Sequence, residues 1–179
     1  MEKAKPVINH QQMLMDVIRF NDEDLEANRD GYMTQRQRSR LNDERFSFKL
    51  MGVLALVACP IFSIAAIIDG IQRHDTVASR VGIIGLICLV TAGITLYTWL
   101  RWRRFDRDLS KGEVAATQGL VRLGMSDRSR STTYMVTVDY VTLNISKRTF
   151  FTFKNGDPYC LYYTPYSRTL LSAEWLRED

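Results

Sequence analysis

The chain has 179 residues and a formal net charge of +4, which suits one domain or two small ones. Its three cysteines form no Cys-x-x-Cys pair and its two histidines lie far from them, which argues against a zinc site or a disulfide framework. No phosphate-binding, dinucleotide-binding or zinc-protease motif occurs, so we expect no enzyme and no cofactor. The apolar residues are concentrated between Phe48 and Trp102, so the composition differs from that of a protein that is water-soluble along its whole length.

The N-terminal segment, residues 1–47, is polar and predicts a cytoplasmic amphipathic helical region. Apolar residues at helical spacing predict a helix from Gln11 to Ala27 that breaks near Asn21. A turn follows at Asn28–Gly31. Thr34 then begins a second helix, with Gln37 three residues on as its capping-box partner. The segment therefore predicts a helix–turn–helix.

Part of this segment, residues 26–37, resembles an EF-hand calcium loop. Asn28 and Asp30 fall on ligand positions and a glycine follows them. Glu26 replaces the usual first-position aspartate, and Gln37 replaces the glutamate that binds calcium through both oxygens. We therefore favour a helix–turn–helix without metal, and keep Asn28 and Asp30 as candidate ligands in an alternative hypothesis, a self-assembling membrane sensor or regulator.

Two apolar segments, residues 48–71 and 81–102, follow. Each is about twenty residues long, which is the length of helix that crosses the ~30 Å hydrocarbon layer of a membrane. Neither has a charge near its centre, and this favours insertion. The connection, residues 72–80, is short, so we predict a two-helix transmembrane hairpin with an external loop.

Basic residues flank both apolar segments and are sparse in the loop between them. Cytoplasmic flanks are enriched in Lys and Arg, so both termini should be cytoplasmic, with residues 103–113 as a basic linker. The flanking arginines are predicted topology signals and lipid-headgroup contacts: Arg36, Arg38, Arg40, Arg45, Arg101, Arg103, Arg104 and Arg107.

Small residues recur at spacings of three and four along the first apolar segment. They are Gly52, Ala55, Cys59, Ser63, Ala66 and Gly70. Small side chains let helix backbones approach closely in lipid, so this face should pack against another helix. That helix is either the second span or a helix of another membrane subunit, self-association included.

The C-terminal region, residues 114–179, changes to a period of two and predicts a cytoplasmic β domain. We expect a small antiparallel barrel or sandwich, OB-like or SH3-like. Within it, Ser126–Thr132 reads as a loop, Tyr140-Val141 as a bulge or bend, and residues 150–153 as a further apolar run among the strands. Turns are expected at residues 154–158 and 164–168. The alternating aromatics are ordinary barrel core, so we expect no nucleic-acid partner.

The two spans and the chain end Tyr159-Cys-Leu-Tyr-Tyr-Thr-Pro-Tyr-Ser-Arg-Thr-Leu-Leu-Ser-Ala-Glu174 resemble small bacterial membrane proteins with two spans and a C-terminal β domain. The resemblance is architectural, covers about the latter two-thirds of the chain and implies no known activity. It implies a bacterial plasma membrane location. The sequence as a whole predicts a non-catalytic membrane subunit or scaffold whose partners are lipid and other membrane proteins.

Overall fold

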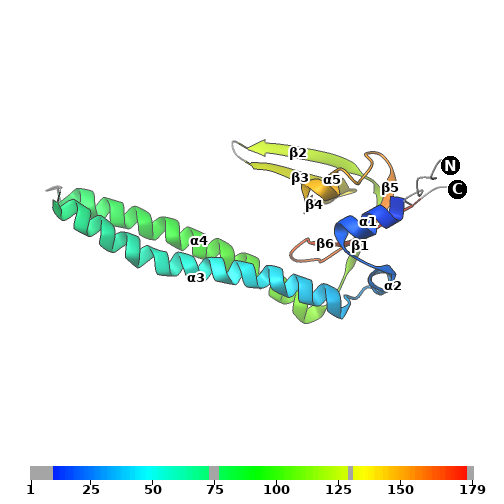
Figure 1. Ribbon diagram of the computed structural model, residues 1–179, viewed down its shortest axis with the longest axis horizontal. Coiled ribbons are helices and arrows are strands. Elements are labelled where there is room, and N and C mark those ends of the chain that lie inside the picture. The colour runs from blue at the N-terminus through cyan, green and yellow to red at the C-terminus, as the bar shows by residue number, and fades with distance from the viewer. Residues whose placement is uncertain (1–9, 73–76, 129–130, 177–179) are drawn as a thin grey trace, which may run out of the picture. The chain divides into compact units, whose positions relative to one another are not determined.

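The computed structural model describes residues 10–72, 77–128 and 131–176. The chain divides into two units. The first, here called the module, combines residues 1–39 with residues 110–179. The second, here called the hairpin, comprises residues 40–109. The elements of each unit are labelled in Figure 1.

The module begins with two short helices, α1 (His10–Ile18) and α2 (Asp22–Arg29). The predicted break near Asn21 is confirmed, because the Asn21 side chain accepts a hydrogen bond from the Asp24 N–H and so caps α2. The helix α3 (Gln35–Gln72) starts where the capping box predicts. Thr34 and Gln37 exchange hydrogen bonds between side chain and backbone in both directions.

Six strands form two three-stranded antiparallel sheets. One sheet has the order β1-β5-β6, from β1 (Ala115–Leu120), β5 (Pro158–Tyr163) and β6 (Leu170–Trp175). The other has the order β2-β3-β4, from β2 (Arg122–Arg128), β3 (Ser131–Val138) and β4 (Val141–Ile145). The described strands thus form two separate sheets and do not close into one barrel.

Two local predictions for this region are wrong. Ser126–Thr132 is no loop at its ends, since β2 continues to Arg128 and β3 starts at Ser131, where cross-strand pairing outweighs the polar composition. The bulge or bend expected at Tyr140-Val141 is a bend: a tight turn, with Asp139 at φ 50°, leads from β3 into β4. Residues 150–153 are not a strand: Ser146 caps the short helix α5 (Lys147–Phe150), and turns follow it.

The core of the module joins both ends of the sequence. Leu14 and Ile18 of α1 are buried in one apolar cluster with Val136, Tyr159 and Leu161 of the strands. The side-chain amide of Gln11 also bonds the edge strand β6, donating to the Ala173 carbonyl and accepting from the Trp175 N–H. The N-terminal helices therefore belong to the β-containing core and cover an otherwise open sheet edge.

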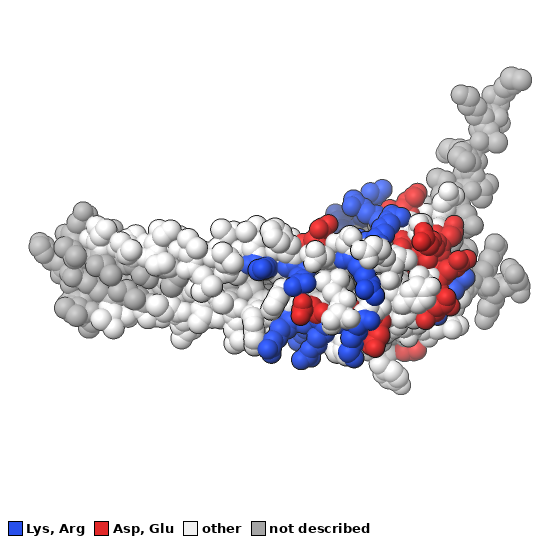
Figure 2. Space-filling model, turned by 90° about the horizontal axis from the view of Figure 1, so that it is seen from below, with Lys and Arg blue, Asp and Glu red and all other residues white. Residues whose placement is uncertain are grey.

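The hairpin consists of most of α3 and most of α4 (Val77–Lys111), which run antiparallel. Gly52 of α3 lies against Thr98 of α4, and the Phe48 ring stacks on the Phe105 ring at 5.5 Å. Both helices are long and apolar enough to cross a membrane, over the stretches Gln35–Phe62 and Val81–Lys111. In the view of Figure 2 this pair presents a long surface drawn in white, without the blue of Lys and Arg or the red of Asp and Glu.

Candidate functional site: an arginine–aromatic collar

Arginines and aromatic rings alternate around one end of the hairpin, where its apolar surface stops. We call this group the collar. It is made of Arg45, Phe48, Tyr97, Trp99, Arg101, Trp102, Arg103, Phe105 and Asp106. Its members come from the helical turns in which the sequence of each apolar segment meets its basic flank.

Three arginines of the collar lie over aromatic rings. The guanidinium carbon of Arg103 is 4.1 Å from the centroid of Trp99. The same atom of Arg101 is 4.8 Å from the centroid of Phe48, and its Nη1 donates to the Tyr97 hydroxyl at 3.0 Å. Cation–π contacts of this kind contribute about 0.5–1 kcal/mol each when exposed.

The third arginine, Arg45, links the two helices. It lies 5.3 Å from the centroid of Trp102 and forms an ion pair with Asp106 at 3.1 Å. Underneath, Phe105 is only 2% exposed. The collar therefore combines a packed aromatic layer with cations on its outer side, the amphipathic pattern of side chains that lie between an apolar medium and water.

On the apolar side of the collar, the hairpin leaves large side chains uncovered. Leu54 and Ile61 of α3 are 59% and 60% exposed, and Leu89 of α4 is 71% exposed. Soluble monomers rarely expose apolar patches larger than a few hundred Å². The hydroxyls of Thr91 and Thr98 donate to carbonyls of their own helix, which keeps these polar groups paired without water.

The eight predicted arginines divide between the two units. Arg45, Arg101 and Arg103 belong to the collar, and Arg40, Arg104 and Arg107 are exposed on the same helices. Arg36 and Arg38 belong to the module instead. Arg36 lies 3.9 Å from the carboxylate of Asp24, and the Arg38 guanidinium packs against the backbone of Gly112. Headgroup contact stays a prediction for all eight.

Of the predicted small-residue face, Gly52 is buried in the hairpin. A Cβ atom there would lie 3.1 Å from Oγ1 of Thr98, which is close for such a contact. The side chains of the other five residues lie outside the part that the structure describes: Ala55, Cys59, Ser63, Ala66 and Gly70. The face as a whole stays a prediction.

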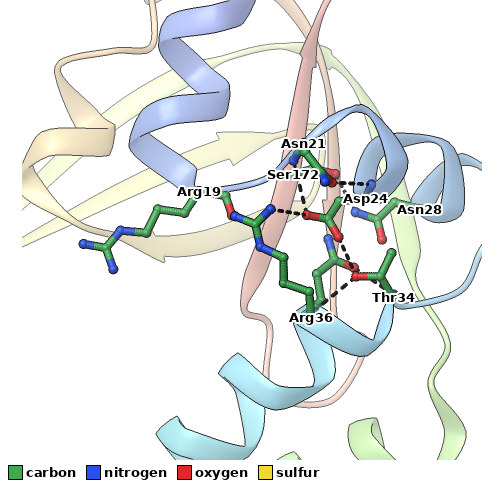
Figure 3. Close-up of polar contacts among 8 residues, drawn as sticks. Arg19, Asn21, Asp24, Asn28, Thr34, Arg36 and Ser172 are labelled. Carbon is green, nitrogen blue, oxygen red and sulfur yellow. Dashed lines mark hydrogen bonds and ion pairs between the residues drawn. The ribbon is translucent and has the colours of Figure 1, made fainter.

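Within the module, Asn28 and Thr34 of the EF-hand-like stretch take part in a largely buried polar cluster with Asp24 and Ser172 (Figure 3). Asp24 is 1% exposed and accepts hydrogen bonds from the Thr34 hydroxyl and the Asn21 N–H. Asn28 is equally buried, and its Nδ2 donates to the Ser172 hydroxyl at 2.6 Å. The cluster ties α2 to β6 and to the start of α3. The sequence carries a signal for it, the Asn21-x-x-Asp24 capping box, which sequence reasoning missed.

This arrangement differs from a calcium loop. Residues 26–29 are helical, so their side chains diverge, and Asp30 is exposed at the end of α2. Calcium takes about six to eight oxygens. In the described parts of the chain no three or more His, Cys, Asp or Glu side chains are grouped so that they could hold a metal ion. The sensor alternative stays a prediction, which calorimetric titration of the purified chain with calcium would test.

The fold and site define a class in broad terms: an α+β protein with two helices that are long and apolar enough to cross a membrane. A scan against protein-family models, a search of curated proteins and a search of solved structures each found no match. Function therefore has to be inferred from the chain's own physical chemistry.

Proposed function

We propose that the chain is an integral membrane protein anchored by the hairpin, with residues 48–71 and 81–102 as its spans and both termini on the cytoplasmic side of a bacterial plasma membrane. One observation carries the proposal: exposed leucines and isoleucines continue along both helices until they meet the collar. Lipid would cover those side chains, and the collar would lie at headgroup level. The basic residues beside the collar support the orientation.

We further propose that its role is that of a non-catalytic subunit or scaffold. In this role the hairpin associates with other membrane helices, and the module is held at the cytoplasmic surface for contact with a larger complex. Two helices alone cannot enclose a pore, and central charges that would conduct ions are missing from both predicted spans of the sequence. A finer fold type for the module, such as an OB-like or SH3-like arrangement of its sheets, stays part of this proposal.

Membrane insertion is tested by placing one arginine at either of two comparably exposed leucines. Leu89 lies in the hairpin and Leu120 in the module, at 71% and 62% exposure. A charge in the middle of a span costs about 2.5–3.5 kcal/mol on insertion, whereas an arginine on a wetted surface costs almost nothing. We expect Leu89→Arg to lower the yield in the carbonate-washed membrane pellet, and Leu120→Arg to leave it unchanged. Recovery of the unaltered chain in the alkaline carbonate supernatant would refute the membrane proposal.

Association through α3 is tested by enlarging the small residues. The triple variant Ala55→Leu, Cys59→Leu, Ser63→Leu should remove partners that co-purify in mild detergent, because bulky side chains keep helix backbones apart. The matched control, Val53→Leu, Val57→Leu, Ala65→Leu, alters three exposed positions of the same helix and should retain them. If the first triple variant keeps every partner, association does not use this face.

A further inference from the structure

A patch of exposed apolar side chains lies on the module, where α5 packs beside β3, the partner strand of β2. Phe151 is 69% exposed and Met125 of β2 is 63% exposed. Between them Tyr134, the cross-strand partner of Met125, has its ring centroid 6.3 Å from that of Phe151 and 5.1 Å from that of Phe150. Met125, Tyr134 and Phe151 thus form one continuous patch next to the buried ring of Phe150, here called the α5 patch.

Two cations stand beside this patch. Lys147 and Arg148, the first residues of α5, are exposed and lie within one helical turn of Phe151. The carboxylate of Asp127, two residues beyond Met125 in β2, accepts a hydrogen bond from the Thr132 hydroxyl at 3.2 Å. The α5 patch therefore presents an uncovered aromatic ring with adjacent positive charge, which matches the layering of a headgroup region: anionic phosphates outside and apolar chains beneath.

We propose that the α5 patch binds the surface of a bilayer containing anionic phospholipid, with Phe151 and Met125 entering the headgroup layer and the Lys147 and Arg148 cations meeting lipid phosphates. The inference rests on the proposed function, because the anchored hairpin would keep the module close to the same bilayer. A contact that is too weak to hold a free protein is then effectively intramolecular. The patch would give the module a second, charge-dependent attachment.

Hydrogen exchange of the full chain in lipid nanodiscs tests this. The amides of Phe150, Phe151 and Phe153 are hydrogen-bonded within the α5 turn, so they exchange when that turn opens. In nanodiscs of phosphatidylcholine with phosphatidylglycerol, in about a three to one ratio, we expect residues 147–153 to exchange about tenfold more slowly than in phosphatidylcholine alone.

The double variant Lys147→Glu, Arg148→Glu should abolish this lipid dependence, and Phe151→Ser should reduce it. The matched control, Arg122→Glu, Arg168→Glu, changes two exposed arginines of the module by the same total charge and should retain it. Equal exchange in both lipids overturns the inference, and so does an equal loss of lipid dependence in the control. Protection that appears only in native membranes assigns the patch to a protein partner instead. Failure of the chain to enter nanodiscs at all would contradict membrane anchoring by the hairpin. That outcome differs from equal exchange in both lipids, which contradicts only lipid binding by the α5 patch.

Discussion

The module and the hairpin use the same apolar residue types in opposite ways. In the module, Leu14, Leu143 and Leu161 are fully buried. In the hairpin, Leu54 and Leu89 are more than half exposed, although their helices are regular. A leucine stabilises the module by leaving water for a protein interior, whereas these two hairpin leucines are not covered by other described residues of the chain. Lipid around the hairpin, as proposed above, would account for the contrast.

The largest expected effect breaks this contrast directly. Leu143→Ala empties a fully buried position of β4 and should lower the free energy of unfolding of the module by about 2–5 kcal/mol. Leu86→Ala removes the same atoms from an α4 position that is 63% exposed and should change the free energy of unfolding of the hairpin by less than about 0.5 kcal/mol. Chemical unfolding in detergent, followed through near-ultraviolet circular dichroism, measures both. An equally large loss for Leu86→Ala would mean that protein covers the outer face of α4.

The next effect concerns the close approach of α3 and α4 at Gly52. Gly52→Leu would place a side chain against Thr98 and should weaken helix pairing by about 1–3 kcal/mol. Gly85→Leu is the control, because no atom lies within 4 Å of a Cβ at that position. Spin-label distances between α3 and α4 should widen in the first variant only. Unchanged distances in Gly52→Leu would show that the helices do not pack through this glycine.

Sequence patterns predicted the elements whose determinants are local. The apolar runs of the hairpin, the break at Asn21 and the Thr34–Gln37 capping box all depend on residues within one or two helical turns. The turn at residues 154–158 is likewise local, and Gly156 adopts φ 88° there as a turn glycine can. These features could be predicted from the sequence because they are determined by residues that are close together in the chain.

The remainder depends on contacts between distant parts of the chain. Nothing near Leu14 indicates that it packs in one core with Tyr159, and nothing in Gln11 indicates that its amide bonds the edge of β6. The polar ends of β2 and β3 become strands only because they pair with each other. The collar was predicted in part. Its arginines were identified as flanking charges, but their pairing with particular rings depends on which sides of α3 and α4 face each other.

A smaller effect is expected from the cap at the start of α3. Thr34→Ala removes the hydroxyl that accepts from the Gln37 N–H and donates to Asp24, and should cost the module about 1 kcal/mol. Thr34→Ser keeps that hydroxyl and should be nearly neutral. Thermal unfolding of both variants compares them. A Thr34→Ser loss as large as that of Thr34→Ala would assign the effect to the methyl group and not to the cap.

The pH dependence of the module should be smaller again. Burial lowers the pKa of His10 from its usual 6.5, with a further lowering by the Lys154 ammonium and an opposing effect of Asp157. The unfolded chain therefore takes up this proton at a higher pH than the native module does. The contribution of neutral His10 is complete above pH 6.5 and is lost as the pH falls below it. The melting temperature should decline over that range, and His10→Gln should flatten the decline. An identical pH profile in His10→Gln would show that another group titrates.

The smallest effect is a gain in stability. Arg19, the residue after α1, has φ 67°, a left-handed conformation that a residue with a Cβ atom adopts at a cost. Arg19→Gly should stabilise the module by about 0.5–1 kcal/mol, because glycine has no such cost and is the usual residue at this place after a helix. Arg19→Ala removes the same charge but keeps the Cβ, so it should not stabilise. The Arg19 carbonyl, which accepts from Arg36, is retained in both variants. Equal melting temperatures for the glycine and alanine variants would mean that the backbone at residue 19 relaxes in solution. A gain in melting temperature that is confined to Arg19→Gly would show that residue 19 adopts the left-handed conformation in the native module. The properties of the hairpin should be the same in both variants.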